Sequence, residues 1–432
     1  MPVKTLLAAS LTALVAVAGS AAASLPDAGT DVVGTVSTRL VAAPTQVEAP
    51  RPAATASLGS RVSSALSTST ARTVSAAVDV DGLGAVLRRD AAHSLPPAST
   101  EKSYVVSAAL LALGGDARLT TEVAATATST AGVLPGDLWL VAGGDPYLTK
   151  AGLRALAKAV HDAGVTVVQG DVALDDSRYD ALRRNPGWKS SWVPGELGPL
   201  SAFALDRNAY RTDSAYLRDP ALPNAVVFRD DLKAEGVVVQ GSVKRSRRPA
   251  AATTVAQRVS GPLTAITSRL LKASDNFAAE MLLKEVGKTA GGEGSSKAGV
   301  ATVKQVLGEQ GVPFGAATDG SGLSSYDRQT AVGQLALLRA LGASPVADQL
   351  RAALPLACVD GTLKKRMCGT AAARNVAAKT GTLSGVANLS GYATTRSGRA
   401  VRFAFVLTGV RDSAKARAAI DRACVLLASS TD

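Results

Sequence analysis

Hydrophobic residues alternate with polar ones or cluster in short runs at both ends of the chain, and these patterns predict strands and helices. Two strand-like runs meet at Asp81-Gly82, a pair of residues typical of a β-hairpin. The expected strands are 73–82, 83–90, 386–395 and 399–410, and the expected helices are 58–66, 96–115, 261–287 (two adjoining helices), 331–341 and 414–428. The two ends of the chain are therefore expected to supply helices and a sheet.

The pattern changes in the middle of the chain, where strands and helices alternate. Strand-like runs at 136–144 and 165–175 lie on either side of a helix at 149–164. Residues 221–243 repeat the order of helix then strand, and a basic run at 244–249 predicts a closing loop. We find no internal repeat. The alternation indicates a distinct α/β segment between the two ends.

The first 23 residues predict a secretory signal peptide. Lys4 precedes an apolar stretch that is too short to span a bilayer, and small residues follow up to Ala23. Residues 24–56 are rich in Ala, Pro, Thr, Val and Ser and predict a flexible linker. No later run is apolar for long enough to cross a membrane. We therefore expect an exported mature protein with no transmembrane segment, in the periplasm or outside the cell.

Charge and cysteine content indicate which partners the protein can bind and whether its cysteines form a disulfide. The net charge of +12 fits either attraction to an anionic wall polymer or general solubility, and no zinc-finger spacing or stacking aromatic motif indicates nucleic-acid binding. Cys358 and Cys368 bracket a short polar loop that an oxidising compartment would allow them to close as a disulfide. Cys424 lies in an apolar run and is expected to be a buried free thiol.

One helical run carries a lysine that needs an explanation. Pro96 and Pro97 end the preceding segment, and either Ser99 or Thr100 is expected to cap the new, mostly apolar helix. Ser99 and Lys102 then lie one turn apart on the same face. Because an ammonium group is costly to bury unless it is paired, Lys102 indicates chemistry at this position.

Two further motifs support a nucleophilic site. The sequence SDN occurs once, at Ser274–Asn276 between two helices, and KTGT occurs once, at Lys379–Thr382 before a strand. Each motif alone also fits a cap, a turn or the entry to a hairpin. The ordered set S-x-x-K, S-D-N and K-T-G is the pattern of class A β-lactamases and penicillin-binding proteins.

The residue types in this set fit acyl transfer. A serine hydroxyl is a poor nucleophile until a base removes its proton, and a desolvated Lys102 with a lowered pKa can be the base for Ser99. Ser274 and Lys379 would add a proton relay and a positive charge, and Asn276 would hold the substrate amide.

The main chain is expected to complete the site. The backbone N–H groups of Ser99 and Thr382 would form the oxyanion hole, and Gly381 would let the substrate approach its strand closely.

Designs based on histidine have little support. His93 and His161 are the two histidines, and no nucleophile elbow or metal-binding motif accompanies them. A Ser-His-Asp triad or a zinc peptidase site is therefore disfavoured, both histidines are expected at the surface or in structural roles, and no metal or other cofactor is expected.

The chain resembles the D-alanyl-D-alanine carboxypeptidase/endopeptidase family, the class C low-molecular-mass penicillin-binding proteins. Besides the three motifs, the sequences "LVAGGDPYL", "GVTVVQGDVALDDSRYD", "TDGSGLSSYD" and "LPLACVDGTLKKR" match the family pattern in order, from about residue 57 to the C-terminus. The resemblance implies an α+β fold of the β-lactamase/transpeptidase type, in which helices flank an antiparallel sheet. Residues 57–132 and 256–432 would form this domain, and residues 133–255 would form an inserted α/β domain.

The family's reaction is implied as well. Ser99 would attack the D-Ala-D-Ala bond of a peptidoglycan stem peptide, release D-Ala, and pass the acyl group to water. β-Lactams would acylate the same serine. Many relatives also cleave D-alanyl-diaminopimelate cross-bridges and carry a second inserted domain, but residues 205–228 run straight on here, so that domain is expected to be absent.

Further residues match the family's substrate cleft. The positions concerned are Thr380, Gly381, Thr382, Leu323, Leu383 and Ser384. Trp192 and Glu196 match places that meet the stem-peptide side chain, where Glu196 would hold the free amine of diaminopimelate. A core aromatic residue and a surface charge are the simpler interpretation of these two, and we favour it.

Two other functions use the same residues. A serine β-lactamase would share the machinery, although the long insertion and the lack of a deacylating glutamate motif count against it. A catalytically silent wall-binding protein would not need the intact lysines and serines of the three motifs.

Overall fold

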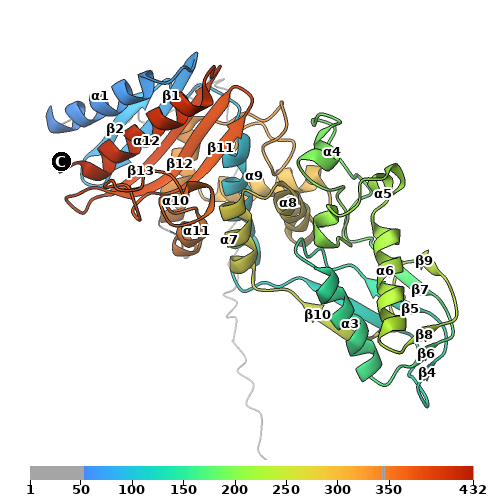
Figure 1. Ribbon diagram of the computed structural model, residues 1–432. Coiled ribbons are helices and arrows are strands. Elements are labelled where there is room, and N and C mark those ends of the chain that lie inside the picture. The colour runs from blue at the N-terminus through green and yellow to red at the C-terminus, as the bar shows by residue number, and fades with distance from the viewer. Residues whose placement is uncertain (1–52, 343, 345, 432) are drawn as a thin grey trace, which may run out of the picture. The chain divides into compact units, whose positions relative to one another are not determined.

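The computed structural model describes residues 53–342, 344 and 346–431, which belong to one compact unit (Figure 1). The predicted signal peptide and residues 24–52 of the predicted linker lie outside the described residues. Helix α1 (Ala53–Ser67) begins three residues before the expected last residue of the linker. The predicted linker boundary at residue 56 is therefore wrong, because the helix expected at 58–66 extends further toward the N-terminus.

A five-stranded antiparallel sheet joins the two ends of the chain, in the order β11–β12–β13–β1–β2. Its strands are β1 (Thr73–Val80), β2 (Gly84–Arg89), β11 (Ala377–Leu383), β12 (Val386–Thr394) and β13 (Ala400–Thr408). Strand β11, which carries the KTGT motif, is at the edge of the sheet. This arrangement confirms the predicted hairpin and the sheet shared by the two ends.

Side chains from alternate positions of the strands enter two separate cores. Phe403 and Phe405 pack on one face against α1 and α12 (Ser413–Ser429). Ala404 and Val406 point to the other face, where α10 (Ala331–Gly342) covers β1 and β13. The helix expected at 414–428 thus covers the sheet that the preceding strand completes.

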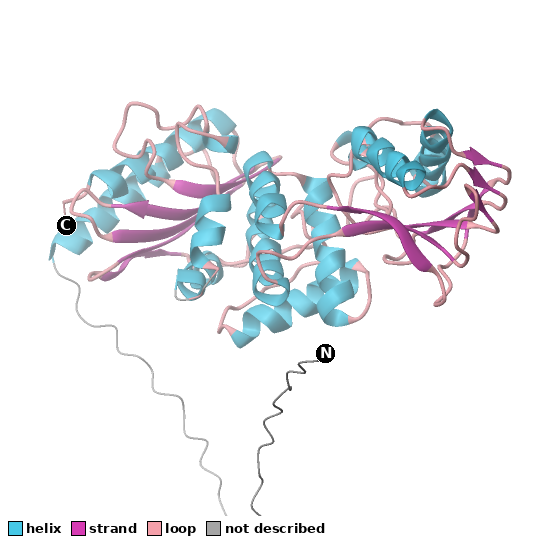
Figure 2. Cartoon of the chain, turned by 90° about the horizontal axis from the view of Figure 1, so that it is seen from below, coloured by secondary structure: helices cyan, strands magenta, loops and turns pink. Residues whose placement is uncertain are grey.

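A layer of helices lies beside this sheet and carries two of the three motifs (Figures 1 and 2). Its members are α2 (Glu101–Leu113), α7 (Leu263–Ala273), α8 (Asn276–Gly291), α9 (Ser296–Glu309) and α11 (Ala347–Ala353). Every residue of α2 from Glu101 to Leu110 is buried, as its apolar composition predicts. Helix α2 therefore has no solvent-facing side over most of its length.

The start of α2 differs from the prediction. A 3₁₀ turn spans Ala98–Thr100, and neither Thr100 nor Ser99 caps the helix with its side chain. The Thr100 hydroxyl donates instead to the carbonyl of Pro97 (2.7 Å), and the Ser99 hydroxyl accepts from Lys102 (3.0 Å). The expected cap is therefore wrong, because both hydroxyls have other partners.

The middle of the chain forms a second five-stranded sheet, ordered β10–β3–β5–β7–β9, and a small parallel sheet, ordered β4–β6–β8. Their strands are β3 (Thr120–Ala125), β4 (Val133–Leu134), β5 (Leu138–Val141), β6 (Val167–Val168), β7 (Val172–Asp175), β8 (Val238–Val239), β9 (Val243–Arg245) and β10 (Thr253–Val259). Helices α3 (Lys150–Asp162) and α6 (Ala221–Ala234) pack against each other beside them.

The pairing of β3 with β10 moves the edges of the inserted segment. These two strands pair with each other, and β3 also pairs with β5, so all three belong to one sheet. The predicted boundary at 132/133 leaves β3 outside the inserted domain, although β3 pairs with strands inside it. The boundary at 255/256 cuts through β10. Both boundaries are therefore wrong. The segment that enters and leaves through this sheet runs from about residue 120 to about residue 259.

Three short repeats supply six strands of the middle segment, β4 to β9, although no repeat was expected. The sequences VLPGDLWL, VVQGDVAL and VVQGSVKR begin at residues 133, 167 and 238, and each gives one strand to the small sheet and one to the larger. Gly170 donates its N–H to the carbonyl of Gly136 (2.9 Å), and Gly241 donates to Gly170 (3.0 Å). A β-carbon on Gly170 would lie 2.4 Å from the Gly136 carbonyl carbon, so the stacking requires glycine there.

Acidic side chains continue this ladder beside the glycines. Asp137 accepts the N–H of Asp171 (2.9 Å), and Asp171 accepts that of Ser242 (2.6 Å). Lys244 then binds both carboxylates, at 2.7 and 2.8 Å. Lys244 and Arg245 belong to β9, so the basic run expected to be wholly a loop begins in a strand.

Two short helices, α4 (Trp192–Gly195) and α5 (Ser214–Arg218), complete the middle segment. Only α5 and short loops separate residue 209 from α6, so no second domain is inserted there, as predicted. No described helix is long and apolar enough to cross a membrane.

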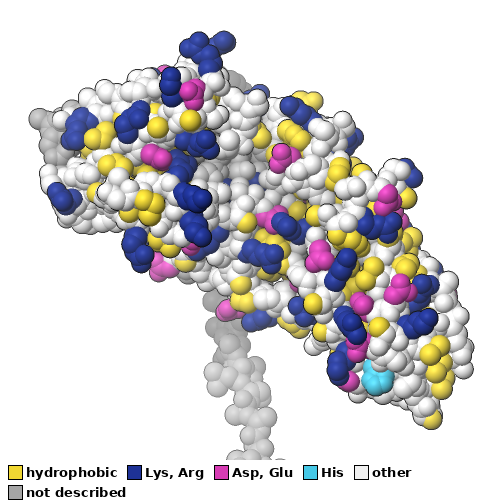
Figure 3. Space-filling view, viewed as in Figure 1, with side chains coloured by type: hydrophobic (Ala, Val, Ile, Leu, Met, Phe, Trp, Pro, Cys, Tyr) yellow, Lys and Arg dark blue, Asp and Glu magenta, His cyan; other side chains and the backbone are white. Residues whose placement is uncertain are grey.

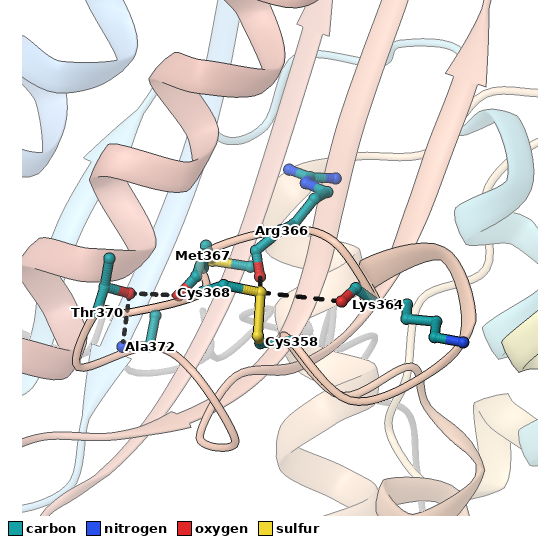
Figure 4. The surroundings of a disulfide bond; sticks show 7 residues. All are labelled: Cys358, Lys364, Arg366, Met367, Cys368, Thr370 and Ala372. Atoms are coloured by element: carbon teal, nitrogen blue, oxygen red, sulfur yellow. Dashed lines mark hydrogen bonds between the residues drawn. A yellow bond between two sulfur atoms is a disulfide. The ribbon is translucent and has the colours of Figure 1, made fainter.

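A disulfide joins Cys358 and Cys368 and closes the loop between them (Figure 4). Cys424 is a buried free cysteine. Both features agree with the expectation from the sequence.

Charged side chains are dispersed over the surface. Figure 3 shows Lys and Arg side chains along the whole face in view, with Asp and Glu between them. The excess of basic residues is thus spread over this face rather than collected in a single strip.

We predict that Gly170→Ala destabilises the protein by about 1–3 kcal/mol, because the added methyl group has to displace backbone in a closely packed ladder. Urea unfolding checks this value. Gly308→Ala is the matched control, since a β-carbon there would meet no atom within 4 Å. Its stability should equal or slightly exceed that of the wild type. Equal stability of Gly170→Ala and the wild type would contradict the account of the ladder.

Candidate active site

Ser99 and Lys102 meet at the start of α2 as predicted. The Lys102 ammonium donates to the Ser99 hydroxyl (3.0 Å), to Oδ1 of Asn276 (2.8 Å) and to the carbonyl of Ser321 (2.6 Å). Lys102 is fully buried, whereas Ser99 is half-buried. The lysine therefore reaches the serine from the protein interior and leaves the outer side of the hydroxyl accessible.

The SDN motif forms the turn between α7 and α8. Ser274 ends α7 in a left-handed conformation (φ 54°, ψ 41°), and Asp275 caps α8 by accepting the N–H of Ala278 (3.1 Å). This tight reversal directs the side chain of Ser274 toward Lys379 and that of Asn276 toward Lys102.

The KTGT motif contributes the second lysine from edge strand β11. Lys379 is fully buried and donates to the Ser274 hydroxyl (2.8 Å) and to the carbonyl of Thr380 (2.8 Å). The site thus contains two buried lysine–serine pairs, Lys102–Ser99 and Lys379–Ser274.

Gly381 has a structural role that the sequence did not indicate. A β-carbon on Gly381 would lie 2.8 Å from the carbonyl oxygen of Pro97. Glycine therefore allows β11 to pack against the turn that presents Ser99. The hydroxyl of Thr380 bonds to that of Thr362 in the disulfide loop (2.9 Å).

Burial sets the electrostatics of both lysines. Desolvation lowers the pKa of Lys102 to about 8, although the negative charges of Asp319 and Glu280 act in the opposite direction. Desolvation also lowers the pKa of Lys379 well below its usual value, and the charge of Lys102 lowers it further. Both lysines can therefore lose a proton more easily than an exposed lysine can.

A group of buried carboxyls behind Lys102 was not predicted from the sequence. Glu101, Glu280, Asp319 and Asp327 are all fully buried. Burial, followed by the charge of Asp319, raises the pKa of Glu101 well above its usual value, that of Glu280 to about 8, and that of Asp327 to about 10. Asp319 and Asp327 lie in the family-matching segment TDGSGLSSYD and Glu101 lies within S-x-x-K, but the sequence did not indicate that these acids are buried near one another, because distant segments bring them together.

Two of these carboxyls hold the loop that binds Lys102. Glu280 accepts the N–H groups of Gly320 (2.9 Å) and Ser321 (2.7 Å), and the Ser321 carbonyl accepts from Lys102. Asp319 accepts the indole N–H of Trp188 (2.6 Å). The carboxyls therefore position the acceptor of the lysine as well as setting its electrostatic environment.

A cleft of about 620 Å³ opens over Ser99. Most predicted site residues line it, together with five that the sequence did not indicate. The predicted ones are Ser99, Trp192, Glu196, Ser274, Asn276, Leu323, Thr382, Leu383 and Ser384, and the additional ones are Pro96, Lys189, Ser324, Ser325 and Val386. Thr380 and Gly381 are not part of the lining.

Trp192 and Glu196 agree with our preferred interpretation of a core aromatic residue and a surface charge, and both also line the cleft. Trp192 is half-buried and packs on the core of the middle segment, but it also forms part of the cleft wall. Glu196 is exposed in the same wall, and Lys189 places its ammonium 5.7 Å from the Trp192 ring centroid. The cleft therefore presents an anion, a cation and an aromatic ring together.

Neither histidine lines the cleft. His93 and His161 are both exposed, and His161 lies in the last turn of α3, as predicted. Among the described residues, no group of three or more His, Cys, Asp or Glu side chains could hold a metal ion.

A serine in contact with a buried lysine and facing an open cleft is the arrangement expected of a serine-type hydrolase, and the comparisons with known proteins agree with this class. The chain belongs to the D-Ala-D-Ala carboxypeptidase 3 (S13) family, whose model matches residues 58–216 and 208–430. This membership confirms the family resemblance and the predicted enzyme class.

Two curated relatives show the extent of the similarity. The chain is 31% identical to a D-alanyl-D-alanine carboxypeptidase of Actinomadura sp. (strain R39) over 385 residues, which cover 70% of this chain and 72% of the relative. It is 31% identical to carboxypeptidase DacB of Mycolicibacterium smegmatis over 376 residues, covering 80% and 79%.

A solved structure confirms the predicted α+β fold. Penicillin-binding protein 4 of Haemophilus influenzae superposes with a TM-score of 0.73 at 23% identity and covers 84% of this chain and 97% of its own.

We predict that Glu280→Gln becomes more stable relative to the wild type as the pH rises. Burial raises the pKa of Glu280 to about 8, whereas an unfolded glutamate titrates near ~4.3. Between these values the folded state holds a proton that the unfolded state has lost, so wild-type stability falls with rising pH. Glutamine removes this titration and keeps an oxygen for Gly320 and Ser321.

Urea unfolding of both proteins between about pH 5 and about pH 8 tests this sign. A stability difference that stays constant, or that moves toward the wild type as the pH rises, would contradict it.

Proposed function

We propose that the protein is a serine-type D-Ala-D-Ala carboxypeptidase that trims peptidoglycan stem peptides through an acyl-enzyme on Ser99. The observation that carries this proposal is the 3.0 Å contact between the Ser99 hydroxyl and the fully buried ammonium of Lys102. Family membership supports the substrate, and the cleft above Ser99 supplies space for a peptide.

The acylation step that we propose uses these contacts. Lys102 in its neutral form takes the proton of the Ser99 hydroxyl, and Oγ attacks the carbonyl carbon of the penultimate D-Ala. The N–H groups of Ser99 and Thr382, which both line the cleft, stabilise the oxyanion. The C–N bond then breaks, and the proton held by Lys102 passes by way of Ser274, which Lys379 contacts, to the leaving amine of the terminal D-Ala, so that Lys102 is neutral again.

Deacylation reverses these roles. Water enters the cleft, loses a proton to neutral Lys102 and attacks the ester carbon. The Ser99 oxygen leaves and regains a proton, which restores the enzyme and releases the shortened stem peptide. Asn276, which accepts a hydrogen bond from Lys102 and also lines the cleft, is suited to hold the substrate amide in both steps.

The cleft wall fits a zwitterionic side chain in the stem peptide. Glu196 can bind the free ammonium of diaminopimelate, Lys189 can bind its carboxylate, and the Trp192 ring can pack on the methylene groups between them. Cleavage of D-alanyl-diaminopimelate cross-bridges by the same site stays a prediction from the family resemblance.

The cellular location belongs to the same proposal. The signal peptide predicted at residues 1–23, and a substrate that lies outside the cytoplasmic membrane, support export to the periplasm or cell surface and association with the wall. A solved structure of penicillin-binding protein 4 from Haemophilus influenzae is a complex with a β-lactam, and we propose β-lactams as covalent inhibitors of this protein too.

The mature protein incubated with a fluorescent penicillin should carry a stable adduct on the peptide containing Ser99, as located by mass spectrometry. Ser99→Ala should carry none, because the attacking oxygen is absent. Rapid turnover of penicillin by the wild type would support a β-lactamase instead. If the wild type forms no adduct and hydrolyses no penicillin, the catalytic proposal fails and a wall-binding protein is the alternative.

The acylation rate should rise with pH. Burial lowers the pKa of Lys102 to about 8, and only the neutral amine can accept the serine proton. The second-order rate constant for penicillin should therefore increase about tenfold per pH unit below about pH 8 and level off above it. The initial rate of adduct formation between about pH 6 and about pH 9 measures this dependence. A rate independent of pH across this range would show that Lys102 does not act as the titrating base.

Glu196→Gln should weaken binding of a diaminopimelate-containing pentapeptide selectively. Loss of one exposed charge-assisted contact predicts a KM about three- to tenfold higher, with kcat little changed. A pentapeptide with alanine at the third position, which lacks the second amine, is the control and should show equal KM for the two enzymes. An equal effect on both peptides would disprove the assignment.

A further inference from the structure

Arg207 occupies a strained turn of the middle segment. The consecutive residues Asp206, Arg207 and Asn208 all have positive φ angles, of 47°, 58° and 52°. Residues other than glycine rarely adopt this region, and such conformations persist where the surrounding structure enforces them, often at functional sites. Three in succession therefore need both a structural cause and an explanation of what the turn achieves.

A buried polar network enforces this turn. The fully buried Asn208 side chain accepts hydrogen bonds from the N–H of Leu205 (3.1 Å), the hydroxyl of Tyr216 (3.2 Å) and the amide of Asn224 (2.9 Å). It donates to the carbonyl of Pro199 (2.8 Å). The middle segment thus holds the backbone of the turn from the inside, and the Arg207 side chain is left to project away from that network.

The Arg207 guanidinium reaches the SDN motif. Its Nη1 donates to Oδ2 of Asp275 at 3.0 Å, where the Asp275 side chain is 4% exposed and that of Arg207 is 47% exposed. Among the described residues, Arg207 is the cation that lies within ion-pair distance of this carboxylate. The other oxygen of Asp275 caps α8. One carboxylate therefore links the middle segment to the start of the helix.

Asp275 lies between the two residues that contact the lysines. Ser274 precedes it and accepts from Lys379 (2.8 Å), while Asn276 follows it and accepts from Lys102 (2.8 Å). A rotation of the Asp275 backbone would move both neighbours at once. Because Arg207 binds the Asp275 oxygen that does not cap α8, it restricts that rotation.

We propose that Arg207 is a positioning residue of the active site, through which the strained turn of the middle segment keeps the SDN motif aligned with Lys102 and Lys379. This inference rests on the proposed function, because its readout is acylation of Ser99. Arg207 is not among the residues that line the cleft, so its effect is expected on the rate of the chemical step rather than on binding.

The test compares Arg207→Gln, Arg207→Lys, Asp275→Asn and the double variant Arg207→Gln/Asp275→Asn. Asparagine keeps an oxygen that can cap α8. The matched control is Arg154→Gln, because Arg154 belongs to the same segment and pairs with Glu235 at 2.6 Å, on a helix that contributes nothing to the cleft. Stopped-flow measurements with a fluorescent penicillin separate the limiting acylation rate from the dissociation constant of the initial complex, and thermal unfolding reports the integrity of the fold.

Arg207→Gln should lower the limiting acylation rate about tenfold, with little change in the dissociation constant or in Tm. Arg207→Lys should recover most of the rate, and Arg154→Gln should match the wild type. The double variant should be no slower than Asp275→Asn, since both substitutions remove the same interaction.

A limiting acylation rate of Arg207→Gln equal to that of the wild type would overturn the inference. Losses of rate that add in the double variant would overturn it as well. If Arg207→Gln does not fold, Asp275→Asn decides alone, and a wild-type rate in that variant would also overturn it. Failure of the wild type itself to form an adduct would instead overturn the proposed function.

Discussion

The desolvated ammonium of Lys102 is the constraint on which the rest of the site depends. It lies at the start of a helix that is buried on every side, and it has three oxygen partners, one of them the hydroxyl of Ser99. If a single close carboxylate compensated the whole desolvation cost of the ammonium, the lysine would stay charged. If nothing compensated this cost, the ammonium could not be buried. The structure lies between these limits, because it places neutral acceptors around the ammonium and carboxyls further behind it.

This intermediate state explains why so many acidic residues are buried near one lysine. Their mutual repulsion and desolvation favour protonation, so the group carries less negative charge than its composition implies. Glu280 and Asp319 accept hydrogen bonds from backbone N–H groups of residues 320–324. The same segment supplies the carbonyl that Lys102 contacts. Electrostatic tuning and mechanical positioning are thus functions of the same side chains.

The middle segment takes part in this arrangement rather than merely adding surface. Trp188 bonds to Asp319 behind the lysine, Arg207 bonds to Asp275 beside it, and Trp192 and Glu196 form one wall of the cleft. Elements that the sequence separates from the motifs by many residues therefore contact the machinery at three points.

The sequence predicted the parts of this structure that local rules determine. Ser99 and Lys102 could be paired because helix geometry fixes residues one turn apart, and the sheet shared by the two chain ends followed from alternating strands. The start of α2 was harder, since the hydroxyls of Ser99 and Thr100 have tertiary partners that outcompete a cap.

The boundary of the middle segment could not be found locally either, because it depends on β3 pairing with β10 across more than a hundred residues. The reason for Gly381 is of the same kind, since the atom it avoids belongs to Pro97, far away in the chain. Buried acids such as Glu280 give no local signal at all, because only the folded chain brings them behind the lysine. The three repeats of the middle segment, in contrast, were visible in the sequence as V-x-x-G spacings and were missed.

The most direct test of this account is the release of D-Ala from a soluble diaminopimelate-containing stem pentapeptide by the mature protein. We expect one D-Ala for each tetrapeptide formed, with continuous turnover by the wild type and none by Ser99→Ala. Absence of D-Ala release by a folded wild-type protein would contradict the assignment of Ser99 and Lys102 as a carboxypeptidase site.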